Sequence, residues 1–174
     1  MPRTINTTVY KYDELSCTAQ EKARDDWRET MTTDVYDRSC EMVRDDADNI
    51  GLTIEQLGQY RADNSGYFFT SAFDTVQKIF KEHGPDCETH KIAAAYEAAI
   101  DALPDDVTNL EEQSRQAEAL DALETEFLAD LLEAYRKMRD KEDEYQLSDE
   151  MVAENIRANE YEYTEDGKFV TRRA

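Results

Sequence analysis

The segment from Asp101 to Glu133 constrains the fold most, because its apolar residues have helical spacing while its other positions are largely acidic. It contains eleven acidic residues against a single basic residue, Arg115. A surface that serves only solubility mixes both signs of charge. The segment therefore predicts a long helix, over about residues 109–144, with an anionic outer face and an apolar inner face. The apolar face consists of Leu110, Ala117, Leu120, Leu123, Phe127 and Leu131.

Six carboxylates of this helix are the candidate partner-binding residues. Four glutamates recur in steps of seven or eight residues, which places them about two helical turns, or roughly 11 Å, apart. Two aspartates lie between them. Duplex DNA carries one charge per ~1.7 Å of its axis, so a rod of fixed carboxylates can imitate a phosphate backbone. The alternative is a solvated acidic face without a partner. The six residues are Glu111, Glu118, Asp121, Glu126, Asp130 and Glu133.

The whole chain is strongly acidic, with a formal net charge of −21 over 174 residues. Residues 101–174 hold nine basic and 22 acidic residues, so most of the excess lies there. Affinity for phosphates comes from Lys and Arg residues that displace counterions, so such a field repels nucleic acid and anionic membranes. The expected partners are therefore basic proteins or cations, without direct binding to nucleic acid or to a membrane.

The cysteines and the N-terminal residues predict a cytoplasmic protein. Cys17, Cys40 and Cys87 are odd in number and have no tight spacing, which argues against a disulfide framework. Residues 1–10 lack the apolar core of a signal peptide. No apolar run approaches the roughly 20 residues that a membrane span requires.

The remaining patterns predict an α+β fold in a single domain over residues 1–174. We expect a small antiparallel sheet, made of an N-terminal strand and two hairpins, that is covered by helices. Residues 87–145 are a candidate helical elaboration of this core. The expected strand covers 4–12, and the expected hairpins cover 53–73 and 161–171. The first expected helix begins at Ser16 or Thr18 and has an apolar stripe that runs from Leu15 to Met31. Further helices are expected over 34–49, 74–82, 87–103, 109–144 and 148–158.

The sequence contains no catalytic motif, which predicts that the protein is not an enzyme. There is no nucleophile elbow, phosphate loop, dinucleotide fingerprint or HExxH motif. His83, Cys87 and His90 lie within eight residues, but a structural zinc site needs four ligands and a catalytic one needs three with an open position. We therefore expect no metal and no cofactor, with a metal-dependent enzyme as the least favoured alternative.

Tyrosines are concentrated on the segments expected to form strands. They predict either a partly open recognition surface or a half-buried sheet face beside helices, and the second interpretation is preferred. These tyrosines are Tyr10, Tyr12, Tyr60, Tyr67, Tyr161 and Tyr163.

The two ends of the chain resemble a family of small phage and prophage proteins. The likeness is carried by residues 9–16 (VYKYDELS), 19–24 (AQEKAR), 148–150 (SDE) and 156–167 (IRANEYEYTEDG). The middle departs from the family, where a Gly-rich loop would be expected instead of residues 63–68 (DNSGYF). The shared motifs are caps, turns and strand edges, so the resemblance implies no active site.

The resemblance implies a phage-encoded protein that acts in the cytoplasm of a bacterial host cell. Small acidic phage proteins include counter-defence inhibitors of the anti-CRISPR and anti-restriction kind, some of which imitate DNA. The first hypothesis is therefore an acidic inhibitor that binds a basic nucleic-acid-binding host defence protein, with DNA mimicry as its means. The second is a structural or regulatory phage accessory protein that acts through self-association, as a homo-oligomer, or through a partner interface.

Overall fold

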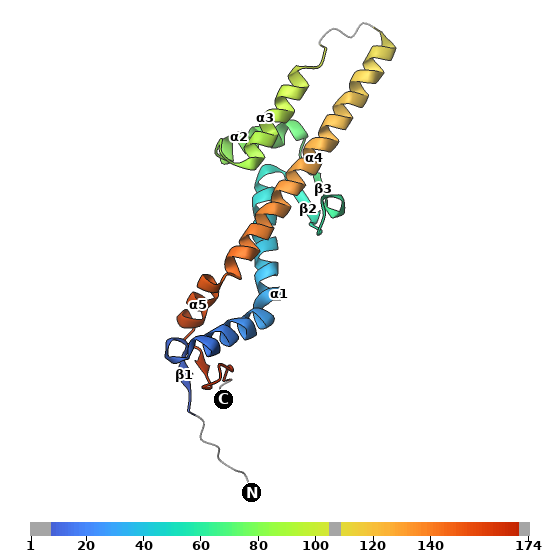
Figure 1. Cartoon of the computed structure of the whole chain (residues 1–174). Helices are drawn as coiled ribbons and strands as arrows, with labels where there is room; N and C mark the ends of the chain where they lie inside the picture. The colour runs from blue at the N-terminus through green and yellow to red at the C-terminus, as the bar shows by residue number, and fades with distance from the viewer. Residues whose placement is uncertain (1–7, 105–108, 171–174) are drawn as a thin grey trace. The chain divides into compact units, whose positions relative to one another are not determined.

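The computed structural model describes residues 8–104 and 109–170 (Figure 1). Contacts group the chain into two compact units, one formed by residues 1–39 with 141–174 and the other by residues 40–140. Each unit has its own hydrophobic core. Two helices, α1 and α4, contribute residues to both units. The prediction that residues 1–174 form a single domain stays a prediction.

The terminal unit joins both ends of the chain through a short antiparallel pair of strands. β1 (Tyr10–Lys11) pairs with β4 (Glu162–Tyr163), and a 3₁₀ turn, η1 (Tyr12–Glu14), follows β1. α5 (Asp149–Ala158) begins at Ser148, whose side chain accepts a hydrogen bond from the Met151 amide. The core contains Tyr12, Leu15, Ala19, Ala23, Trp27, Val35, Val152, Ala153, Ile156 and Tyr163.

One helix, α1 (Cys17–Ile50), takes the place of the two expected between residues 16 and 49. The Ser16 hydroxyl accepts from the Ala19 amide, which confirms Ser16 as the N-cap. The expected break at the polar residues 32–34 is wrong, because neither Gly nor Pro occurs there. The Thr32 hydroxyl donates to the Arg28 carbonyl four residues earlier, so this polar side chain is satisfied within the helix. The helix ends before Gly51, whose positive φ of 93° is typical of a glycine that terminates a helix.

The central unit packs a hairpin and three helices around the second core. β2 (Leu52–Gln56) and β3 (Ser65–Phe68) are antiparallel, with η2 (Arg61–Asp63) between them. The helices are α2 (Ala72–Glu82), α3 (Glu88–Asp101) and α4 (Leu110–Gln146). The core contains Val43, Ala47, Ile50, Leu52, Ile54, Leu57, Ala72, Val76, Ile79, Ala93, Phe127, Leu131, Leu132 and Tyr135.

The α+β fold class is confirmed, while the strands of the described residues form two separate two-stranded sheets rather than one. The N-terminal strand is shorter than expected, because the chain enters η1 after Lys11. Residues 4–7 of the expected strand lie outside the described residues. The second strand of the first hairpin ends at Phe68, because Ser71 caps α2. The expected hairpin over residues 161–171 turns at residues 166–167 and is closed by a bridge between Tyr163 and Phe169, while residue 171 lies outside the described residues.

Gly167 fixes the C-terminal turn against α1. Its φ is 84°, and a Cβ atom at this position would lie 2.3 Å from the Ala19 carbonyl oxygen. We therefore expect Gly167→Ala to lower the free energy of unfolding by about 1–2 kcal/mol, because an L side chain is strained in this backbone conformation and also collides with α1. Urea denaturation measures the change. Gly84→Ala is the matched control, since a Cβ at Gly84 has nothing within 4 Å. An equal loss in both variants would contradict the expectation.

Candidate partner-binding surface

The first half of α4 is exposed, and the second half is packed. The Asn109 side chain begins the helix by accepting a hydrogen bond from the Glu112 amide at 2.9 Å. Leu110 is 85% exposed and Leu120 is 38% exposed. Phe127 and the residues near it are buried against the central core, so the expected apolar inner face exists only from about Leu123 onward. The expectation that Leu110, Ala117 and Leu120 face inward is wrong, because the core does not extend that far along the helix.

Glu133 is held in an ion-pair network rather than presented to a partner. Its carboxylate accepts two hydrogen bonds from the Arg136 guanidinium, at 2.8 and 2.7 Å. The Lys137 ammonium lies 3.6 Å away. The hydrogen bonds from Arg136, which stabilise the charged form, lower the pKa of Glu133 to about 2. With only 15% of its side chain exposed, Glu133 is a structural residue.

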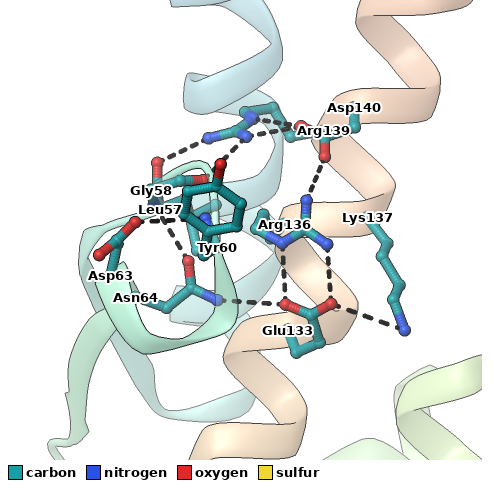
Figure 2. Close-up of polar contacts among 10 residues, drawn as sticks. All are labelled: Leu57, Gly58, Tyr60, Asp63, Asn64, Glu133, Arg136, Lys137, Arg139 and Asp140. Atoms are coloured by element: carbon teal, nitrogen blue, oxygen red, sulfur yellow. Dashed lines mark hydrogen bonds and ion pairs between the residues drawn. The ribbon is translucent and has the colours of Figure 1, made fainter.

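The same network ties α4 to the connection between β2 and β3 (Figure 2). The buried Arg139 side chain donates to the Leu57 carbonyl at 2.7 Å and contacts the Asp140 carboxylate. Asn64 donates to Glu133 at 3.4 Å, and its side-chain oxygen accepts from the Gly58 amide. Arg139 thus holds the loop directly, while Arg136 and Lys137 pair with carboxylates of α4 itself, which agrees with a structural role for this end of the helix.

Arg61 neutralises two more of the candidate carboxylates. Its guanidinium lies 3.0 Å from Glu126 and 2.8 Å from Asp130. All three side chains are more than one-third exposed, so these pairs contribute little to stability. Their effect on recognition is larger, because a positive charge lies between two groups expected to imitate phosphates. Arg61 comes from η2, 65 residues before Glu126, so no local pattern in the sequence signals this contact.

The N-terminal carboxylates differ in their pairing. Glu111 is paired with Arg115 at 2.5 Å, one helical turn later. Glu118 and Asp121 are exposed and form no ion pair with any residue that the structure describes. Glu124 is also exposed and continues the same three-residue spacing. We define Glu118, Asp121 and Glu124 as the acidic row.

The six candidate carboxylates therefore do not form one continuous unpaired face. Four of them have an arginine partner. With about 100° of rotation per residue, the six are also spread over roughly half of the helix circumference. Of the six, Glu118 and Asp121 have no ion pair among the described residues, and with Glu124 they form the acidic row that is available to a basic partner. Like charges three residues apart on a helix repel each other, so binding a cation there relieves an unfavourable interaction.

The histidine cluster is occupied by contacts within the central unit. The His83 Nδ1 atom lies 2.7 Å from the Thr89 hydroxyl, and its Nε2 atom lies 3.6 Å from the Asp46 carboxylate. His90 contacts the His83 carbonyl, and Cys87 precedes α3 as an exposed thiol. Within residues 8–104 and 109–170, no group of three His, Cys, Asp or Glu side chains is arranged to hold a metal ion.

The tyrosines do not gather on one sheet. Tyr10, Tyr67 and Tyr163 lie on strands, and among these Tyr163 is buried while Tyr67 is 50% exposed. Tyr60 precedes η2 and is 66% exposed. The preferred prediction of a half-buried sheet face thus holds for some of the set but not for all of it.

Comparisons with protein-family models, with curated proteins and with solved structures found no match. Among the described helices, none has both the length and the apolar character needed to cross a membrane.

Proposed function

We propose that this protein is a non-enzymatic binding protein that captures a basic protein surface through the first half of α4. The observation that carries the proposal is the acidic row, whose three carboxylates are exposed and without an ion pair in the described part of the chain. Residues 110–126 contain six acidic side chains and one basic one, so the field there is strongly negative. Such a field accelerates encounter with a basic partner and weakens with salt.

The partner we propose is a nucleic-acid-binding host protein, and the setting is a phage-encoded inhibitor in the bacterial cytoplasm. The resemblance of residues 9–16, 19–24, 148–150 and 156–167 to phage proteins supports this setting. We propose DNA mimicry over a shorter surface than the sequence predicts, because Arg61, Arg115 and Arg136 pair with four of the six carboxylates first considered. The acidic row rises about 4.5 Å per step along the helix axis, which is comparable to the axial rise of about 3.4 Å per phosphate along one strand of duplex DNA. It would thus replace a short stretch of phosphates.

We expect charge reversal in the acidic row to abolish capture of the partner. The test compares the wild type with Glu118→Lys/Asp121→Lys as bait in a bacterial lysate, at about 0.1 M and about 1 M salt. The Debye length falls from roughly 10 Å to 3 Å between these conditions. The wild type should retain a basic nucleic-acid-binding protein at low salt only, and added duplex DNA should displace it.

A matched control separates a local effect from a change in net charge. Glu41→Lys/Asp45→Lys alters the net charge by the same amount, at exposed positions on α1 in the same unit. This control should keep the partner. Retention by the acidic-row variant, or equal loss in both variants, would refute the acidic row as the binding surface.

A second candidate function is a structural or regulatory accessory protein that associates with itself. The observation that favours it is a run of exposed aromatic residues near β3 and the start of α2. Tyr67, Phe69 and Phe73 are 50%, 53% and 67% exposed. An apolar interface persists at high salt, so light scattering at about 1 M salt should detect a homo-oligomer of the wild type. The Phe69→Ser/Phe73→Ser variant should be a monomer under the same conditions.

A further inference from the structure

The terminal unit contains an aromatic cavity of about 460 Å³ that the acidic row does not involve. α1 supplies one wall, with Trp27 at its centre, and the C-terminal segment supplies the other, with Tyr161, Tyr163 and Phe169. The Phe169 ring meets Tyr161 at 5.1 Å and Tyr163 at 6.1 Å, both nearly edge to face. Trp27 and Tyr163 are buried, while Phe169 is half exposed at the mouth. The volume falls within the range of small-ligand sites, roughly 300–1,000 Å³.

Among the described residues that line the cavity or pair with its lining, carboxylates outnumber cations by three to two. Lys22 and Lys168 also line it, but both face the Asp166 carboxylate, at 3.2 and 3.9 Å. Asp26 and Glu29 line the α1 wall, and neither forms an ion pair with a described residue. Burial, with smaller effects from Tyr161, Tyr12 and Asp26, raises the pKa of Tyr163 to about 12.

Aromatic faces beside free carboxylates favour a cation that also has an apolar surface. Ring faces attract cations, with the largest effect for tryptophan. Asp26 and Glu29 would repel an anionic ligand. A neutral apolar ligand would remove water from both carboxylates without offering them hydrogen bonds in return. The two carboxylates are three residues apart on one helix face, a spacing that suits two-pronged hydrogen bonding. A guanidinium is planar, stacks on rings and donates in a fork, whereas an ammonium is a compact and strongly hydrated charge.

We infer that this cavity receives the side chain of an arginine residue on a protein partner. The inference rests on the proposed function for the class of partner, because a basic protein supplies such a residue. It places a second contact on the terminal unit, where Trp27, Tyr161 and Phe169 enclose the guanidinium and Asp26 and Glu29 pair with it. The partner must therefore present one arginine side chain that fits the cavity, in addition to the positive surface that the acidic row attracts.

The single tryptophan of the chain reports directly on the cavity. We expect acetyl-Gly-Arg-Gly-amide to change the Trp27 fluorescence saturably. The same peptide with citrulline, which keeps the shape but has no charge, should bind at least about tenfold more weakly. A glutamate peptide should give no saturable change. Equal binding of the arginine and citrulline peptides, or no saturable response to either, would overturn the inference.

Conservative variants connect the fluorescence change to the named residues. Glu29→Gln alters an exposed position, so the fold is retained, and it should weaken the arginine peptide about tenfold. Glu21→Gln, also exposed on α1 but outside the cavity, should leave binding unchanged. Unchanged affinity in Glu29→Gln, or an equal loss in Glu21→Gln, would overturn the assignment.

The full-length Glu118→Lys/Asp121→Lys variant separates this inference from the proposed function. It should respond to the arginine peptide as the wild type does, because the cavity residues belong to the other unit. A normal fluorescence response together with unaffected lysate capture would refute the acidic row and leave the cavity standing. A missing response in the wild type, with lysate capture dependent on the acidic row, would refute the cavity alone.

Discussion

Replacing Glu133 by glutamine should lower the free energy of unfolding at pH 7 by about 2–3 kcal/mol. The wild-type carboxylate accepts two hydrogen bonds from Arg136 and lies near Lys137, and these contacts lower its pKa from 4.5 to about 2. One pKa unit corresponds to about 1.4 kcal/mol, so the full shift would amount to about 3.4 kcal/mol, and solvent screening of the pair lowers the expected value to the range given. The glutamine keeps the shape but loses the charge, so the guanidinium keeps only one of its two carboxylate acceptors, Asp140. Urea denaturation at pH 7 measures the difference.

The difference between the wild type and this variant should shrink in acid. A carboxyl whose folded-state pKa is lowered stabilises the fold at pH values above its unfolded pKa, here about 4.5. That contribution is lost as the pH falls from about 4.5 towards 2, because the carboxyl binds a proton in the unfolded state over this range while it stays charged in the folded state. Glutamine does not titrate, so the variant has no such pH-dependent contribution. The free energies of unfolding of the two proteins should thus become nearly equal as the pH approaches 2. A gap that stays constant from pH 7 to pH 2 would contradict the assigned role.

Glu118→Gln is the matched control on the same helix. Its side chain is exposed and has no ion pair among the described residues, so the free energy of unfolding should change by less than about 0.5 kcal/mol. The two variants should affect partner binding in the opposite way. Under conditions in which both are folded, Glu118→Gln should weaken capture of the partner and Glu133→Gln should leave it unchanged. The reverse pattern would return Glu133 to the partner-binding surface.

Features that depend on a few neighbouring residues could be predicted from the sequence. The N-caps at Ser16 and Ser148, the glycine stop at Gly51 and the turn at residues 166–167 each follow from local backbone chemistry. The pairing of Glu133 was not predicted, although Arg136 and Lys137 follow it at three and four residues, within reach on one helix face. That spacing alone favours a structural ion pair over a free charge.

Features that depend on distant contacts could not be predicted in this way. Arg61 reaches Glu126 and Asp130 only because the connection between β2 and β3 lies beside α4. The division into two sheets likewise depends on which distant segments pair, and no local pattern encodes that choice. The residues of the aromatic cavity were assigned to a helix stripe and to a strand. Trp27 and Tyr163 line one space only because β4 returns to pair with β1.

Leu131→Ala should lower the free energy of unfolding by about 2–5 kcal/mol, because it removes a fully buried side chain and leaves a void in the central core. Ile156→Ala should have an effect of the same size on the core of the terminal unit. Leu120→Ala is the control on α4, where the side chain is already 38% exposed and much less burial is lost. Circular dichroism during urea denaturation measures all three.

The fluorescence of Trp27 in the same denaturation tests whether the chain is one domain. Trp27 belongs to the core of the terminal unit, whereas Leu131 belongs to the core of the central unit. Because α1 contributes residues to both cores and α4 extends into both units, we expect a single cooperative transition. Leu131→Ala should then lower the midpoint reported by Trp27 as much as the midpoint reported by circular dichroism. If Trp27 responds to Ile156→Ala but not to Leu131→Ala, the two units unfold independently and the single-domain prediction is wrong.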